Sequence, residues 1–291
     1  MFNCFRRRTY IYNWDSIVKL VSPVQLRVYG QGILELFYRL SSNSESLGFK
    51  PWNKETNIER ENLILQLARK FNGGKYCCFY FRAKGVAGED KADNYSRNTR
   101  SFTELLDIFA YLKSIGFLIL LYGDIPDNGL AEARLHGVLT YEDMNISKDV
   151  WDLLTPSIGE FTIGSPGGGL MLPVKFQKKI LVIDAFGYYF AVPNALHTYK
   201  YITDENMNLM SPLTCIAKTP WRLDFPDSFT IRYLPVPLLL EIIKEFLECI
   251  NHWPDSNSTY IEIHEHSWLT ISPGALVSEK FLEYIKNFTK I

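Results

Sequence analysis

From about residue 75 onward, short apolar runs alternate with segments in which apolar residues recur at helical spacing. Such runs, rich in aromatic and β-branched residues, are typical of buried strands. The predicted strands are Tyr76–Phe81, Phe117–Leu121, Glu160–Ile163 and Ile180–Asp184. Between the first two, Ser101 and Glu104 form an S-x-x-E capping box ahead of a predicted helix that Gly116 ends. The alternation predicts an α/β fold with a mostly parallel sheet flanked by helices.

The first 75 residues follow a different pattern, without such alternation. They contain two helix-like segments, Val24–Leu40 and Glu59–Phe71, joined by a polar linker and closed by Asn72-Gly73-Gly74. We therefore predict a short helical N-terminal region, residues 1–75, followed by a Rossmann-like domain, residues 76–291.

The second half of the chain has weaker signals, and after Phe186 the sequence becomes irregular and rich in Tyr, Pro and Asn. Pro235 and Pro237 favour the start of a helix. The further predicted elements are a short strand at Val138–Tyr141, a helix from Ser147 to Leu154, a helix from about Leu170, a helix at Leu238–Ile250, a polar strand at Thr259–His266 and a last helix at Ser278–Phe288.

Composition narrows the class of protein. Of the 291 residues, 47% are hydrophobic, which is enough for a large buried core. The net charge of −1 gives no field that attracts nucleic acid, so we expect no nucleic-acid partner. The five cysteines form no CxxC motif, and no apolar run reaches the roughly 18 residues of a membrane span. We expect a cytoplasmic protein with reduced thiols.

One basic run, Arg6-Arg7-Arg8, stands out in this neutral chain. We interpret it as a solvated terminus. The alternative is a peripheral contact with the inner face of the membrane.

Ligands of open parallel sheets bind beyond the carboxyl ends of the strands. This rule selects Arg82 onward, Gly123-Asp124, Gly164–Gly169 and Asp184-Ala185. The glycine segment stands between a predicted strand and a predicted helix, an order that offers bare backbone amides to a phosphate. Its candidate phosphate-binding residues are Gly164, Ser165, Gly167 and Gly168. The alternative is a tight turn that requires glycines at positive φ.

Basic residues follow the first predicted strand. Arg82 ends that strand, and Arg97, Asn98 and Arg100 lie in the loop behind it. Because a guanidinium can bind a diphosphate through two parallel hydrogen bonds, Arg82 and Arg97 are candidate ligands of such a group. Ordinary surface arginine is the alternative for both, and it is our interpretation of Arg100.

Acidic and imidazole side chains supply further candidates. Asp93, in the same loop, is a candidate general base, although loop carboxylates are also commonly just solvated. Asp124 can bind a ribose or simply form a turn, and His197 is a candidate donor-site group. The alternating set Glu262, His264 and His266 shares one strand face, which we interpret as an exposed polar face and not as a metal site.

At these residues the chain resembles a family of bacterial glycosyltransferases found with surface-polysaccharide genes, which is distantly similar to fucosyltransferase-type GT-B enzymes. The family pattern has a strand ending in His-x-Arg, a loop with Tyr-Arg-Asn, a strand ending in Gly-Asp and a turn of the form Phe-x-x-Gly-x-x-x-Gly. The corresponding segments are Tyr80-Phe81-Arg82, Tyr95-Ser96-Arg97-Asn98, Gly123-Asp124 and Phe161-Thr162-Ile163-Gly164-Ser165-Pro166-Gly167-Gly168.

The resemblance implies a GT-B-type nucleotide-sugar-binding domain. The implied reaction is transfer of a sugar from a nucleotide diphosphate donor to a hydroxyl of a glycan or lipid-linked glycan, without a metal or other cofactor. The catalytic candidates are then Arg82 and Asp93, the loop carboxylate selected above. Residues 1–75 are a reduced acceptor side, and the alternatives are an acceptor side supplied by another chain or none at all. The implied donor-binding residues are Arg97, Asn98, Asp124, Gly164, Ser165, Gly167, Gly168 and His197.

Two departures from the family pattern support a second hypothesis. Tyr80 stands where the family has its histidine, and residues 1–75 are fewer than the roughly 100 that an acceptor domain with its own sheet requires. The alternative is therefore a catalytically degenerate nucleotide- or glycan-binding module. A transferase of phosphate or pyruvate on a similar sheet is a third possibility.

Overall fold

A computed structural model describes residues 54–71, 73–82, 100–185, 192, 194–209, 230–253, 260–264, 267–270 and 275–288. The predicted helix Val24–Leu40 lies outside the described residues, as does the basic run at residues 6–8. So does the loop that carries Asp93, Arg97 and Asn98.

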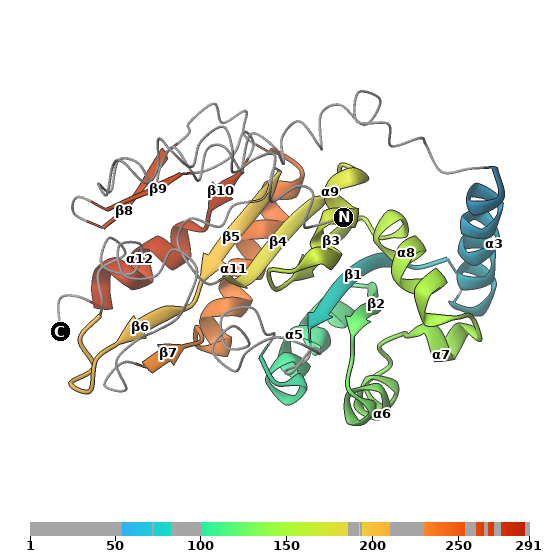
Figure 1. Cartoon of the computed structure of the whole chain (residues 1–291), viewed down its shortest axis with the longest axis horizontal. Coiled ribbons are helices and arrows are strands. Elements are labelled where there is room, and N and C mark those ends of the chain that lie inside the picture. The colour runs from blue at the N-terminus through green and yellow to red at the C-terminus, as the bar shows by residue number, and fades with distance from the viewer. Residues whose placement is uncertain are drawn as a thin grey trace, which may run out of the picture.

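A six-stranded sheet lies at the centre of the described structure, and all neighbouring strands in it are parallel (Figure 1). The spatial order is β10-β5-β4-β3-β1-β2. The strands are β1 (Lys75–Arg82), β2 (Phe117–Asp124), β3 (Phe161–Gly164), β4 (Lys179–Ala185), β5 (Ala195–Tyr199) and β10 (Leu276–Val277). The predicted parallel α/β sheet is confirmed.

The order of the strands reverses direction at one point in the sheet. β1 pairs with β2 on one side and with β3 on the other, and the later strands add on the β3 side only. Connections that leave two neighbouring strands in opposite directions open a space beyond the carboxyl ends of those strands. The fold therefore favours a ligand site beyond β1 and β3.

Helices cover both faces of the sheet. One face is covered by α5 and α11, with α12 beside α11, and the other by α8 and α9, with α3 and α7 against α8 (Figure 1). The described helices are α3 (Lys54–Phe71), α5 (Phe102–Ser114), α6 (Asp127–Leu135), α7 (Tyr141–Met144), α8 (Lys148–Ile158), α9 (Met171–Lys175), α11 (Val236–Ile250) and α12 (Glu279–Phe288).

Burial on both faces explains the unbroken apolar character of β1. The Cys78 thiol faces α8 and donates to the carbonyl oxygen of Thr155 at 3.1 Å. The next residue, Phe79, faces the opposite way and packs edge-on against Phe109 of α5, with ring centroids 5.1 Å apart. Since successive side chains of a strand enter two different cores, both must be apolar.

The predicted helix starts agree with the observed caps. The Ser101 hydroxyl accepts from the Glu104 amide at 3.4 Å, and the Glu104 carboxylate accepts from the Ser101 amide at 3.1 Å. Ser147 caps α8 through its hydroxyl, which accepts from the amide of Val150 at 3.4 Å. Both interactions satisfy backbone donors that a helix leaves without intrahelical partners.

Two strands of the sheet lie in the stretch that we expected to be irregular. β5 contains His197 and Thr198, and β10 has only two residues, so neither forms an apolar run. Both are nevertheless hydrogen-bonded in register at one side of the sheet. Their polar residues are accommodated by tertiary contacts that local pattern does not encode.

Two other predicted strands are present in altered form. The segment predicted at Val138–Tyr141 forms a single parallel bridge, between Leu120 and Leu139, at the outer side of β2. The polar strand predicted at Thr259–His266 corresponds to one arm of an antiparallel hairpin, β8 (Tyr260–His264) and β9 (Ser267–Thr270). A separate antiparallel ribbon consists of β6 (Tyr201–Thr203) and β7 (Thr230–Arg232).

Candidate functional site

The strand ends selected from the sequence meet at one edge of the sheet. In the register of the strands, Arg82 pairs with Asp124, Tyr80 pairs with Gly164, and Gly164 pairs with Val182. The carboxyl ends of β1 to β4 therefore lie side by side. Arg82 and the glycine segment thus lie at the same edge of the sheet, and Arg97 lies outside the described residues.

Arg82 is the last residue of β1 and only 8% exposed. Phe81 points toward α5, where its ring centroid lies 6.0 Å from that of Phe102. Because side chains alternate along a strand, Arg82 and Tyr80 share the opposite face, the one that α8 and α9 cover. A guanidinium thus stands at the switch point of the sheet, on the same side as the glycine turn.

The glycine turn that follows β3 is built around the ring of Tyr80. A Cβ atom added to Gly167 would lie 2.7 Å from the Tyr80 hydroxyl, and one added to Gly169 would lie 2.2 Å from Cε2 of the ring. Gly123, at the end of β2, has equally little space for a side chain, because a Cβ atom added there would lie 2.7 Å from the same Cε2 atom. Non-bonded carbon atoms do not approach so closely, so these positions require glycine.

The turn differs from the positive-φ turn that we gave as the alternative, and the helix after it is shorter than predicted. Within residues 164–169 no glycine has a left-handed backbone, and Gly167 is extended with φ 176°, so the requirement is not for a left-handed turn. The helix expected from about Leu170 is a 3₁₀ turn, Gly168–Leu170, followed by the five-residue α9. Such a short helix has too few aligned peptide dipoles to favour an anion at its start.

Three charged side chains lie together at the end of β2, and of these the sequence indicated only Asp124 as a candidate. Asp124 is half exposed, and its Oδ1 lies 4.0 Å from Nζ of Lys148, which is also paired with Asp152 of α8. Oδ1 of Asp152 accepts from the Gly123 amide at 3.1 Å. Burial raises the pKa of the Asp152 carboxyl, against the opposing effect of these hydrogen bonds. Asp152 lies in the middle of a helix, where no motif marked it.

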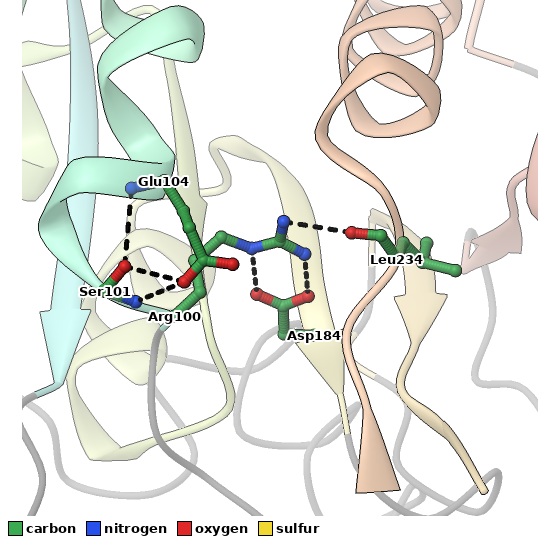
Figure 2. A network of polar contacts seen from close by, with 5 residues as sticks. All are labelled: Arg100, Ser101, Glu104, Asp184 and Leu234. Carbon is green, nitrogen blue, oxygen red and sulfur yellow. Dashed lines mark hydrogen bonds and ion pairs between the residues drawn. The ribbon is translucent and has the colours of Figure 1, made fainter. Parts of the chain in front are cut away.

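The end of β4 holds a buried ion pair on the other face of the sheet. Figure 2 shows the Arg100 guanidinium between the Asp184 carboxylate and the carbonyl of Leu234. Nε donates to Oδ2 of Asp184 at 2.9 Å, one terminal nitrogen donates to Oδ1 at 2.6 Å, and the other donates to the Leu234 carbonyl at 3.0 Å. Both side chains are completely buried.

Arg100 is therefore not a surface arginine, as we had expected. It immediately precedes the capping box of α5, so the helix start directs it inward toward Asp184 (Figure 2). Asp184 has a left-handed backbone, φ 55°, at a bulge between β4 and β5. Such strain persists only where surrounding contacts hold it, and here the bidentate ion pair does so.

Two aromatic–cation contacts extend this cluster. The Tyr233 ring lies 5.3 Å from the Arg100 guanidinium carbon and 4.4 Å from Nζ of Lys200, which follows β5 and is 2% exposed. Burial, together with the nearby Asp184 carboxylate, raises the pKa of Tyr233 to about 12. The cluster, in which Arg100, Asp184 and Lys200 are buried and Tyr233 is partly buried, joins β4, β5 and the starts of α5 and α11.

His197 has no ring nitrogen left for a ligand. The Val192 amide donates to Nε2 at 2.8 Å, so the proton is on Nδ1, which donates to the carbonyl of Leu276 at 2.9 Å. The side chain is completely buried, and burial lowers its pKa to about 4. We therefore correct its assignment from a donor-site group to a structural histidine that joins β5 to β10.

Two properties of the described residues bear on the class of site. Within the described ranges, no group of three or more His, Cys, Asp or Glu side chains could hold a metal ion. Among the helices of the same residues, none combines the length and apolar character needed to cross a bilayer. The side chains of Glu262, His264 and His266 are not among those described.

Comparisons with known proteins add a distant likeness. No protein-family model matches the sequence, and none of the curated proteins does. Among solved structures, the chain aligns with the dodecameric iron-containing heptosyltransferase TibC, solved in complex with ADP-D-β-D-heptose. The identity is 15% and the TM-score 0.33, over 62% of this chain and 45% of that one. A likeness at this level carries no argument about function, and the chain spans less than half of the heptosyltransferase.

Proposed function

We propose that the protein is a glycosyltransferase that binds a nucleoside diphosphate sugar at the carboxyl edge of its parallel sheet and transfers the sugar to a hydroxyl group of a glycan or a lipid-linked glycan. The observation that supports this proposal most is the position of Arg82. It is a largely buried guanidinium at the end of β1, where the order of the strands reverses. Doubly wound sheets bind phosphorylated ligands at this point.

Each candidate residue has one role in the proposed sugar transfer. The planar fork of Arg82, aided by Arg97 and Asn98, would hold the diphosphate and stabilise the negative charge that develops as it departs. Asp124, half exposed at the end of β2, would bind a ribose hydroxyl. Asp93 would take the proton from the acceptor hydroxyl. Gly164, Ser165 and Gly167 would shape the turn beside the diphosphate.

Within that turn, Gly168 is the open position. A Cβ atom added there would meet no other atom within 4 Å, in contrast to Gly167 and Gly169. A ligand that approached the backbone of the turn would do so at this residue.

A second function is favoured by one specific observation. Tyr80 stands where the family pattern has a histidine, and its ring packs against Gly167 and Gly169. An edge that has a packed tyrosine in place of the histidine suits a module that binds a nucleotide or glycan without catalysis. The two functions differ in turnover and not in binding.

Calorimetric titration with UDP, GDP and ADP and their sugars tests the proposal. The wild-type protein should bind at least one of them, and Arg82→Lys should bind it about 10- to 100-fold more weakly, because a lysine cannot reproduce the bidentate contact. The matched control is Arg69→Lys, at an exposed arginine in the last turn of α3, which should bind like wild type.

Two outcomes count against the proposal. If the wild-type protein binds none of these compounds, the nucleotide site does not exist. If folded Arg82→Lys binds as well as wild type, Arg82 is structural. Release of nucleoside diphosphate in the presence of glycan acceptors then separates the enzyme from the non-catalytic module, which binds but does not turn over.

A further inference from the structure

The glycine turn after β3 has a structural partner inside the chain. Tyr80 projects from β1 against the turn, and its register neighbour Tyr122 projects from β2 on the same face. The two ring centroids are 5.3 Å apart, and the Tyr122 hydroxyl donates to the carbonyl of Gly169 at 3.1 Å. Both tyrosines are buried, at 6% and 1% exposure. Two aromatic side chains thus hold one turn.

The glycines around Tyr80 differ in what confines them. At Gly167 and Gly169, the three atoms nearest to an added Cβ all belong to the Tyr80 ring and its hydroxyl. At Gly123, the Cβ would also lie 2.3 Å from the carbonyl oxygen of Phe81, and φ is +100°. At Gly168 there is nothing within 4 Å. The closest obstacle to a side chain at residues 167 and 169 is therefore Tyr80.

We propose that Tyr80 is the positioning residue of this edge. Its ring occupies a socket formed by Gly123, Gly167 and Gly169, with Gly164 packed against its Cβ atom, and so fixes the turn against the ends of β1 and β2. Arg82 lies two residues further along the same strand and on the same face, so the socket also sets where its guanidinium stands. This last step rests on the proposed function of Arg82, whereas the socket itself does not.

A double-mutant cycle on thermal stability tests the socket without any ligand. In the wild-type background, Gly169→Ala should lower the unfolding midpoint by roughly 3–10 °C, because the new methyl overlaps the ring. In a Tyr80→Ala background the same change should have little effect or raise the midpoint, because the methyl enters the space that the ring has left. Tyr80→Val provides a second background if Tyr80→Ala does not fold.

Two other glycines are matched controls for this cycle. Gly168→Ala should be tolerated in both backgrounds, because the position is open. Gly123→Ala should destabilise in both, because its left-handed φ and the contact with the Phe81 carbonyl remain after the ring is removed. If Gly169→Ala shifts the midpoint equally with and without the ring, the socket does not exist and the proposal is wrong.

Ligand affinity then tests whether the socket positions Arg82. The variants Tyr80→Phe and Tyr80→Ala are titrated with UDP, GDP and ADP at a temperature where circular dichroism shows each to be fully folded. Tyr80→Phe keeps the ring and should stay within about twofold of wild type, whereas Tyr80→Ala should bind at least tenfold more weakly. Equal binding by folded Tyr80→Ala would overturn the positioning role.

The two proposals can fail separately. If the wild-type protein binds no nucleotide, the proposed function fails, and the stability cycle still decides the socket. Hydrogen exchange then replaces the affinity measurement. The amides of residues 161–170 and 80–82 should exchange faster in Tyr80→Ala than in Tyr80→Phe, while those of α12 should not change. An equal exchange rate in the two variants contradicts a positioning role.

Discussion

At the residue scale, the buried side chain of His197 holds separate backbone segments together. The imidazole bonds through Nε2 to the Val192 amide and through Nδ1 to the Leu276 carbonyl, so it joins three separate segments of backbone. A proton on Nε2 would break the first of these bonds and place a charge in a dry site. Burial therefore lowers the pKa of His197 from its ordinary value of 6.5 to about 4.

This pKa makes stability depend on pH in a defined direction. The unfolded chain takes up a proton near pH 6.5 while the folded protein does not, so the free energy of unfolding should fall as pH drops from about 6.5 to about 4. The loss from this group is about 3 kcal/mol at the lower end. Urea unfolding at several pH values measures it.

The contribution of His197 is isolated by comparing variants. His197→Gln should be less stable at neutral pH but should lose less further stability between pH 6.5 and 4. His136→Gln, at an exposed histidine that ends α6, should keep the pH dependence of wild type. An unchanged pH dependence in His197→Gln would show that the imidazole already titrates normally in the folded protein.

At the scale of elements, the Arg100–Asp184 pair joins the starts of two helices to the end of a strand. Arg100 precedes α5, Asp184 belongs to β4, and the Leu234 carbonyl lies two residues before α11 (Figure 2). A different carboxylate organises the start of α12, because Glu245 of α11 accepts from the Ser278 hydroxyl at 2.6 Å and from the Glu279 amide at 2.7 Å. Polar side chains from other elements, buried at Asp184 and partly exposed at Glu245, thus hold the starts of these helices in place.

Removing one charge of the Arg100–Asp184 pair should lower the free energy of unfolding considerably. Asp184→Asn retains a residue that tolerates left-handed φ but leaves the Arg100 charge without its counterion, so it should destabilise by about 3 kcal/mol. Arg100→Met in the Asp184→Asn background should recover part of this loss, because the buried charge is gone. Chemical unfolding of the single and double variants gives both values.

The control for this prediction is an exposed ion pair. A terminal guanidinium nitrogen of Arg134 lies 2.6 Å from Oε2 of Glu142, and the two side chains are 62% and 39% exposed. Arg134→Met should therefore change the free energy of unfolding by no more than about 0.5 kcal/mol. If Asp184→Asn proves equally mild, the charge of Asp184 does not hold Arg100 in place.

At the scale of the whole molecule, ligand binding should raise the free energy of unfolding. A nucleoside diphosphate that binds only the folded protein adds about 2.7 kcal/mol at 100 times its dissociation constant. For a chain of this size that corresponds to roughly 5–10 °C in the unfolding midpoint. Arg82→Lys should lose most of this shift at the same concentration. A shift of the same size with the nucleoside alone would show that the phosphates are not recognised.

Much of this arrangement was predictable because strand and helix periods are local properties. The apolar runs of β1 to β4 and the capping box at Ser101 give the order of strands and helices, and parallel strands bring Arg82 and Asp124 to one edge. β5 and β10 were not predictable, because a buried histidine bonded to backbone on both sides looks polar in sequence.

By itself, the sequence determined the α/β class, the parallel sheet and the edge at which Arg82 and the glycine turn lie, since these follow from periodicity and strand direction. Only the tertiary structure decided which residue types particular positions require. Gly169 is required because the Tyr80 ring approaches it from β1, and Arg100 is buried because Asp184 lies opposite, 84 positions away. Such requirements arise between segments far apart in the chain, where a local pattern carries no information about distance.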